Sequence, residues 1–267
     1  MTLRLTALNI YPIKATHGIA LAESEVDGFG LRYDRRWMVV DGSGQFISQR
    51  SHARLALVVP SIQGDRLRVD APGMPTLEVP LRPSSSVSTT VAVWDDVCSA
   101  NWVGEGAAEW FSEFLGGAYS LVHMAEDAMR PADPVFAPAG SRVSFADGFP
   151  FLLISEESLD DLNRRLAEPL PMNRFRPNLV VAGGKPYDED SWNRLEIGGI
   201  RLRVVKPCGR CVVTTTDQMT GERGKEPLRT LATYRKRDGE VMFGQNVVHE
   251  GVGRLRVGDP VAITLPG

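Results

Sequence analysis

Short runs of β-branched and aromatic residues recur along this chain, and many of them are bounded by Gly, Pro or Asp. This pattern is typical of strands separated by turns. Several runs follow one another at intervals of about ten residues, a spacing that favours a β-barrel or a β-sandwich. The clearest runs lie at residues 36–41, 54–60, 65–70, 89–96, 178–184, 200–207 and 261–266.

Helical patterns are few, and three segments carry them. Residues 106–117 group apolar side chains on one face and end at two glycines. Residues 155–169 begin with Ser155 as a candidate N-cap, followed by acidic residues and a stripe of leucines. Residues 226–236 carry Pro227 in the first turn. We therefore expect a mainly β protein with a few helices, in the α+β class.

A Pro- and Ala-rich segment at residues 129–140 lacks any helical or strand periodicity. Such a stretch is the best candidate for a linker in this chain. The sequence therefore predicts an N-terminal domain over residues 1–128 and a second domain over residues 129–267.

Length, charge and cysteine content narrow the class of protein. A chain of 267 residues can bury a substantial core without disulfide bonds. The net charge of −3 gives no global basic field for nucleic acid. No apolar run approaches the roughly 20 residues that span a bilayer, and the N-terminus lacks the pattern of a signal peptide. Three cysteines, an odd number, favour a reducing cytoplasm over a disulfide framework.

Two of the three cysteines, Cys208 and Cys211, lie three residues apart in the segment KPCGRC. Structural zinc needs four ligands, and no second pair is evident. A thioredoxin-like dithiol needs a helix N-terminus, but the residues that follow are typical of a strand or a loop. Burial as two small apolar side chains is a third interpretation. The fourth is a thiolate ligand to molybdenum, favoured by the neighbouring cations Lys206 and Arg210.

Arginines in the segment NRFRPN are candidates for anion binding. Arg176 precedes Pro177, which biases it towards an extended conformation, so Arg174 and Arg176 should point to opposite faces. One of them is then a surface charge and the other can bind an anion. The planar guanidinium suits phosphate because it can donate to two oxygens at once.

Further groups that can bind an anion come from other parts of the chain. Lys14 ends the segment YPIK, where we expect the first strand to end, and Arg35 lies beside a tryptophan in YDRRW. Asp147 and Gly148 predict a tight turn whose backbone amides can face a ligand. Asp217 opens the segment DQMTG, which predicts a turn with its carboxylate bonded to backbone amides.

Taken in order, these segments resemble the MOSC family, and within it the amidoxime-reducing component branch. The resemblance covers nearly the whole chain, as an N-terminal MOSC β-barrel domain followed by the MOSC domain itself. It is carried by YPIK, GLRYDRRWMVV, FADGFPFLLISEESLDDLN, NRFRPNLVV, EDSW, KPCGRCVVTTTDQMTG, KEPLRTLATYRK and FGQN.

The resemblance implies a molybdenum cofactor, in which a molybdopterin dithiolene holds the metal and carries a phosphate. The family's metal-binding cysteine falls on Cys211, whereas Cys208 matches a position that is not a ligand. Gly209 and Arg210 match the loop that leads into the ligand. The implied pterin and phosphate contacts are Lys14, Arg35, Asp147, Gly148, Phe149, Arg176 and Asn178.

This sequence departs from its relatives at several of these positions. A hydroxyl residue that follows the lysine in relatives is Ala15 here, and Gly148 and Phe149 replace a pair of hydroxyl residues. Only backbone amides of that pair are then available to a ligand. A tyrosine near the pterin in some relatives falls on Asn246.

The function implied by the resemblance is reduction of N-hydroxylated small molecules such as hydroxylamines, amidoximes and N-hydroxylated bases. Cys211 is the implied metal ligand, and Asp217 either holds the ligand loop or relays protons. Too few cysteines are present for an iron–sulfur cluster, so we expect a ferredoxin-like or flavoprotein-like electron donor. Two alternatives use the same Cys211, namely sulfur transfer through a persulfide and carriage of the cofactor without turnover.

Overall fold

The largest sheet of this computed structural model, which describes residues 2–82, 87–125 and 127–264, contains nine strands. Eight of them run in the order β19-β14-β15-β17-β12-β13-β1-β2, and the short β16 pairs with β17. The bounds are β1 Arg4–Ile10, β2 Ile19–Leu21, β12 Phe151–Ser155, β13 Leu179–Ala182, β14 Arg194–Ile197, β15 Ile200–Arg210, β16 Lys236–Arg237, β17 Glu240–His249 and β19 Val261–Thr264.

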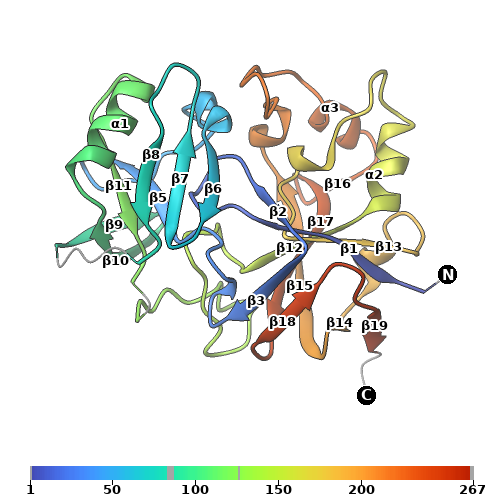
Figure 1. The fold of residues 1–267 in the computed structure, drawn as a ribbon. Helices are drawn as coiled ribbons and strands as arrows, with labels where there is room; N and C mark the ends of the chain where they lie inside the picture. The colour runs from blue at the N-terminus through green and yellow to red at the C-terminus, as the bar shows by residue number, and fades with distance from the viewer. Residues whose placement is uncertain (1, 83–86, 126, 265–267) are drawn as a thin grey trace.

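The first strand of the chain completes the sheet that the second half of the chain builds. β1 pairs antiparallel with β13 and with β2, and Figure 1 shows it in blue among the yellow and red strands. Leu5, Leu8 and Ile10 of β1 are buried in one apolar cluster with Leu179 and Leu202. Burying these side chains stabilises the sheet and joins the two halves of the chain.

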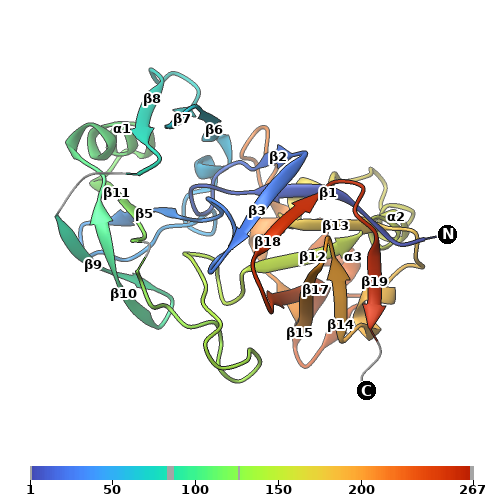
Figure 2. The same ribbon diagram turned by 60° about the horizontal axis from the view of Figure 1, so that its bottom comes forward.

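The remaining strands form three smaller sheets. The β5-β11-β10-β9 sheet and the β6-β7-β8 sheet lie with α1 in the left-hand lobe of Figure 1, and the β18-β3-β4 sheet lies beside β1 in Figure 2. The bounds are β3 Glu23–Asp27, β4 Gly30–Leu31, β5 Trp37–Asp41, β6 Val59–Gln63, β7 Arg66–Asp70, β8 Leu77–Pro80, β9 Ser88–Val93, β10 Asp96–Trp102, β11 Tyr119–His123 and β18 Gly253–Arg256. The expectation of a mainly β protein in the α+β class is therefore confirmed.

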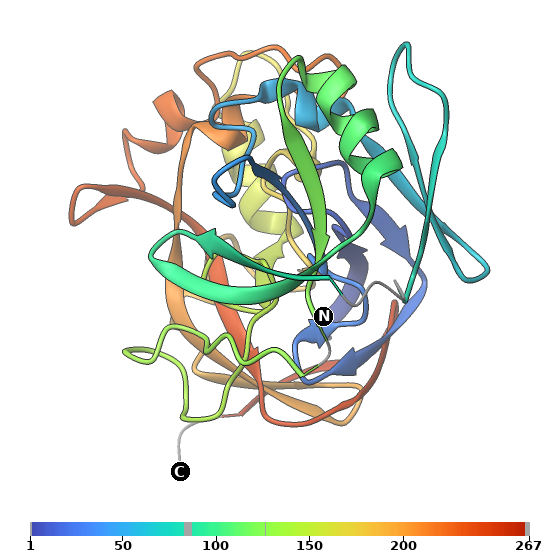
Figure 3. The same cartoon turned by 90° about the vertical axis from the view of Figure 1, so that its left-hand side faces the viewer.

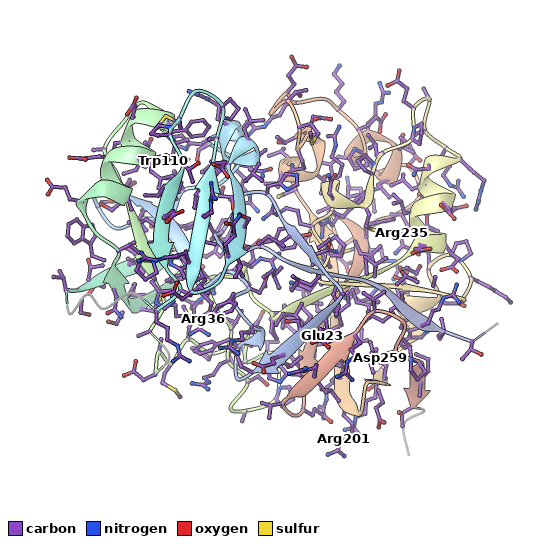
Figure 4. All side chains as sticks on the ribbon, in the orientation of Figure 1. Glu23, Arg36, Trp110, Arg201, Arg235 and Asp259 are labelled. Atoms are coloured by element: carbon purple, nitrogen blue, oxygen red, sulfur yellow. The ribbon has the colours of Figure 1, made fainter. Side chains whose placement is uncertain are left out.

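Helix α1, Glu105–Leu115, forms where the apolar spacing predicts it and ends at Gly116, which adopts φ of 73°. Trp110 and Phe114 are buried, and Trp110 points from α1 towards the adjacent strands in Figure 4. The indole N–H of Trp110 donates to the carbonyl of Pro75 at 2.6 Å. This helix therefore closes the core of the N-terminal lobe.

The other two helices are shorter than the sequence predicts. α2 spans Glu156–Asn163 and is capped by Ser155, as expected, but it ends because the Asn163 side chain bonds both backbone groups of Leu170 and folds the chain back. α3 spans only Leu228–Leu231, since the chain then turns into β16.

Strand predictions also need correction at one place. Residues 54–60 were expected to be a strand, but Ala53–Leu57 form a 3-10 helix and β6 begins at Val59. A short apolar run does not distinguish a buried helical turn from a strand. Conversely, nothing in the sequence indicated that β12 and β13 pair in parallel across α2.

The predicted boundary at residue 128 stays a prediction, and the β1–β13 pairing crosses it. Over the described residues, none of the helices has the length and apolar content that crossing a membrane requires.

Candidate active site

A cleft of about 170 Å³ brings together residues from both halves of the chain. With the exception of Asp217, every predicted site residue lines it. The predicted residues in the lining are Lys14, Arg35, Asp147, Gly148, Phe149, Arg176, Asn178, Gly209, Arg210, Cys211 and Asn246. Their meeting in one place is a finding, whereas their individual roles remain predictions.

Positive side chains dominate this cleft. Five cations line it, and Asp147 is the single acidic residue in the described lining. Such an excess of positive charge inside a concave surface attracts anions. The cations are Lys14, Arg35, Arg50, Arg176 and Arg210.

Lys14 is buried and is held by two oxygen atoms. Its ammonium donates to the carbonyl of Phe145 at 2.7 Å and to the carboxylate of Asp147 at 2.6 Å. Burial lowers the pKa of Lys14, although the attraction of Asp147 opposes that shift. Desolvation in the cleft would raise the pKa of Asp147, but the charge of Lys14 and its hydrogen bond hold it below its usual range. Lys14 does not end a strand as expected, because β1 already ends at Ile10.

Arg35 and Arg176 share the ring of Tyr11. The guanidinium carbons lie 4.5 Å and 4.2 Å from the ring centroid. Arg35 also donates to Asp34 at 2.5 Å and to the side-chain oxygen of Asn178 at 3.0 Å. The Tyr11 hydroxyl donates to a backbone carbonyl, and burial raises the pKa of Tyr11 to about 12, so the ring stays neutral.

Among the residues that the structure describes, Arg176 has no carboxylate partner. One of its terminal nitrogens, Nη1, donates to the carbonyl of Thr16 at 2.5 Å, but the buried Nη2 has no hydrogen-bond partner there. Burial lowers the pKa of Arg176 to about 10. A buried guanidinium that is short of negative charge is stabilised by an anionic ligand.

The backbone around Arg176 differs from the extended segment that the sequence predicts. Met172–Arg174 form a 3-10 helix, and Arg176 adopts φ of 58°. Arg174 and Arg176 are both buried, so neither is the expected surface charge. The lining residues Ala15, Arg35 and Trp94 also have positive φ. Left-handed non-glycine residues are strained, and such strain gathers at functional sites.

The two cysteines of KPCGRC also reach the cleft. Cys208 lies within β15 and Cys211 follows the end of that strand, where irregular pairing with β17 bends the chain. Both thiols are free and half-buried. The carbonyl of Cys211 accepts hydrogen bonds from the backbone and the hydroxyl of Thr214, at 3.1 Å and 3.0 Å. Arg210 donates to the sulfur of Cys208 at 3.0 Å and to the carbonyl of Phe175 at 2.6 Å.

The geometry bears on the four interpretations of the cysteine pair. In the described part of the chain, no group of three or more His, Cys, Asp or Glu side chains that could hold a metal is found, and structural zinc needs four ligands. Cys208 lies in a strand and not at a helix N-terminus, which removes the reason to expect a thioredoxin-like dithiol. Both thiols line the cleft, and Cys208 also packs against the apolar cluster that contains Ile154, Phe175 and Phe243. The interpretation of one thiol as a thiolate ligand to a metal stays a prediction.

Asp217 lies outside the cleft. Its carboxylate accepts hydrogen bonds from the amides of Met219 and Thr220, at 2.8 Å and 3.0 Å, and from Arg174 at 3.1 Å. Those amides and Arg174 lower the pKa of Asp217. The predicted turn is confirmed, and the carboxylate holds the loop, while the alternative role of proton relay has no contact in the cleft to support it.

Two predicted residues position others. The side-chain oxygen of Asn178 accepts from Arg35 and from the amide of Leu152, and its amide group donates to Asn9. Asn246 donates to the carbonyl of Pro207 at 3.4 Å. These contacts orient Arg35 and the start of the cysteine segment.

The turn at Gly148 differs from the one predicted. A Cβ built on Gly148 would meet no atom within 4 Å, and Gly148 has no positive φ, so the position does not require glycine. The loop is instead held by Arg130, which the sequence placed in a linker. Arg130 is 2% exposed and donates to the carbonyls of residues 144, 146 and 147, and to Asp96.

Several lining residues were not predicted from the sequence. These residues are Phe46, Ser48, Arg50, Trp94, Phe175 and Thr214. For Trp94, the run at residues 89–96 predicts only a strand, and no sequence signal marks it as a site residue. Phe175 and Thr214 lie inside the segments NRFRPN and KPCGRCVVTTTDQMTG, whereas Phe46, Ser48 and Arg50 carry no motif and are brought in by the fold.

Comparison with known proteins defines the class to which this fold and cleft belong. Residues 2–118 match the model of the MOSC N-terminal beta barrel domain, and residues 140–262 match the model of the MOSC domain. The protein is therefore a MOSC protein with both domains, as the resemblance indicated.

Relatives that match nearly the whole chain narrow the family assignment. Human mitochondrial amidoxime-reducing component 1 is 37% identical over 94% of this chain and 80% of its own length. Rat mitochondrial amidoxime reducing component 2 is 38% identical over the same shares. The chain belongs to the family of amidoxime-reducing components. The YUAD protein of Bacillus subtilis, a solved structure, covers 98% of this chain and 94% of its own at 12% identity and a TM-score of 0.45, a likeness that adds nothing to this assignment.

Proposed function

We propose that this protein is a molybdenum-cofactor-dependent oxidoreductase that reduces N-hydroxylated compounds. Membership in the amidoxime-reducing component family implies a molybdenum cofactor and reductive chemistry at nitrogen in general terms. The observation that carries the proposal is the meeting of Cys211 with five cations from both halves of the chain in one cleft.

The residues of the cleft suit such a cofactor. Cys211 offers a soft sulfur ligand to the metal. Arg176 offers a buried nitrogen that has no hydrogen-bond partner among the described residues. Lys14 and Arg35 line the same cleft and are held by the carbonyl of Phe145 and the side-chain oxygen of Asn178. A phosphate dianion satisfies several donors of this kind at once. When bound, the cofactor supplies a two-electron oxygen transfer, so that an N-hydroxyl compound, two electrons and two protons give the N–H compound and water.

The chain contributes binding, orientation and charge to this reaction. Thr214 fixes the carbonyl of Cys211, and Asp217 with Arg174 holds the loop behind it. Arg210 ties β15 to the segment that carries Arg176. Three cysteines, two of them in the cleft, cannot ligate an iron–sulfur cluster as well, so the proposal includes a separate electron-donor protein. Location in the cytoplasm remains a prediction from the sequence.

The test is turnover by protein purified from a host that makes the molybdenum cofactor. With a reducing dye as electron source, we expect loss of the N-hydroxyl group from amidoxime and hydroxylamine substrates. Cys211→Ala should abolish turnover and lower the molybdenum content. Cys98→Ala is the matched control, because Cys98 is a half-buried free thiol outside the cleft lining.

Absence of turnover by the molybdenum-loaded protein would overturn the proposal. A persulfide on Cys211, detected by mass spectrometry in place of metal, would instead support sulfur transfer. Release of the cofactor to an apo-enzyme without any turnover would support a carrier.

A further inference from the structure

Trp94 is an exposed aromatic side chain in the wall of the cleft. It lies in the turn between β9 and β10, has φ of 57° and is 38% exposed. Figure 3 shows the β9–β10 hairpin in teal across the front of the molecule. Trp94 thus combines a strained backbone with an exposed ring in the cleft wall, and strain of this kind gathers at functional sites.

The indole is fixed in place by three neighbours. Its N–H donates to Asp147 at 3.1 Å, the Arg50 guanidinium lies 4.4 Å from the ring centroid, and the Phe46 ring packs edge-on at 4.7 Å between centroids. A side chain held in this way is a preorganised flat surface, and because Arg50 covers one face of the indole, a flat ligand would have to stack on the opposite face.

Asp147 adds an acceptor beside that surface. Its carboxylate is bonded to Lys14 and to Trp94, yet the side chain is still 72% exposed. An exposed carboxylate repels phosphate, so Asp147 is poorly suited to the anion-binding role implied by the family resemblance. It can accept hydrogen bonds from a ligand that carries N–H or O–H groups.

We propose that Trp94 and Asp147 form a substrate-recognition platform, in which a planar N-hydroxylated compound stacks on the indole and donates an N–H or O–H to the carboxylate. The amidoxime group is flat and carries both kinds of donor, so its conjugated derivatives match this platform. The inference rests on the proposed function and adds that Trp94 determines preference for flat over aliphatic substrates.

The experiment compares benzamidoxime with acetamidoxime as substrates of the molybdenum-loaded enzyme. Trp94→Ala should lower kcat/KM for benzamidoxime about 2- to 12-fold and leave acetamidoxime nearly unchanged, since stacking of an aromatic pair contributes about 0.5–1.5 kcal/mol. Trp94→Phe should keep most of the preference. Val97→Ala is the control, because Val97 is 70% exposed in the same hairpin but outside the cleft.

Binding of benzamidine, the product, gives a readout without turnover. Calorimetry should show weaker binding to Trp94→Ala, at equal molybdenum content, than to the parent protein. Asp147→Asn should also bind more weakly, and its molybdenum content is measured alongside because Asp147 also bonds Lys14. Equal losses for both substrates, or unchanged benzamidine binding, would overturn the inference while the proposed function stands. A parent protein that binds benzamidine through Trp94 but reduces neither substrate would overturn the proposed function, and with it the substrate role of the platform.

Discussion

Replacing Arg176 by methionine tests whether this arginine binds an anionic cofactor or only stabilises the fold. Arg176 is 8% exposed, and its pKa lies at about 10 against an ordinary value of 12.5. Each pKa unit corresponds to about 1.4 kcal/mol, so the buried charge of Arg176 lowers the unfolding free energy of the cofactor-free protein by about 3 kcal/mol. Methionine removes that cost but also loses the hydrogen bond to Thr16, which contributes about 1.5–3 kcal/mol.

These two terms oppose each other, and the lost contact with the Tyr11 ring also counts against methionine, so Arg176→Met should change the unfolding free energy of the cofactor-free protein by no more than about 2 kcal/mol. Cofactor retention should fall about 10- to 100-fold, because one charge-assisted bond to the anion is lost. Chemical denaturation of protein from a host without the cofactor measures the first effect. Molybdenum content after prolonged dialysis of loaded protein measures the second.

Arg130→Met is the matched control. Arg130 is also buried, but its donors are occupied by Asp96 and by backbone carbonyls. Removing it leaves those acceptors without a partner and should cost about 3–5 kcal/mol. If Arg176→Met destabilised the cofactor-free protein as much as Arg130→Met does, or left cofactor retention unchanged, the reasoning would be refuted.

Two further predictions concern stability. The buried amides of Gln49 and Gln218 donate to each other at 3.0 Å, so Gln49→Leu and Gln218→Leu should each cost about 1–3 kcal/mol, and the double variant less than their sum. Additive costs in denaturation experiments would contradict this coupling. Burial lowers the pKa of His123 to about 4, so the unfolded chain gains a proton near pH 6.5 while the folded protein stays neutral. The unfolding free energy should therefore fall by up to about 3 kcal/mol as pH decreases from 6.5 to 4, and His123→Gln should flatten that profile.

The sequence predicted the residue types of the site better than their conformations. Lys14, Arg35, Arg176 and Cys211 were identified from their order along the chain and the family that order resembles. Their meeting in one cleft depends on β1 joining the sheet of the second half, which no local pattern reveals. The left-handed conformation of Arg176, and the hydrogen bond of its side chain to Thr16, which lies 160 residues away, likewise have no local signal in the sequence.

Segments without periodicity were the least predictable. The Pro- and Ala-rich stretch at residues 129–140 was interpreted only as a linker, yet it carries Arg130, which holds the loop of Asp147. Trp94 had no motif to mark it, and only its placement in a turn at the cleft identifies it as a candidate for binding the substrate. A local pattern reports burial and turns, whereas a binding wall arises from long-range packing.

The central claim is that the sulfur of Cys211 binds molybdenum in the cleft. X-ray absorption at the molybdenum edge measures the number of sulfur neighbours directly. The account predicts one sulfur fewer around the metal in Cys211→Ser than in the parent protein, and no change in Cys208→Ser. An unchanged sulfur shell in Cys211→Ser, or a sulfur lost in Cys208→Ser instead, would contradict it.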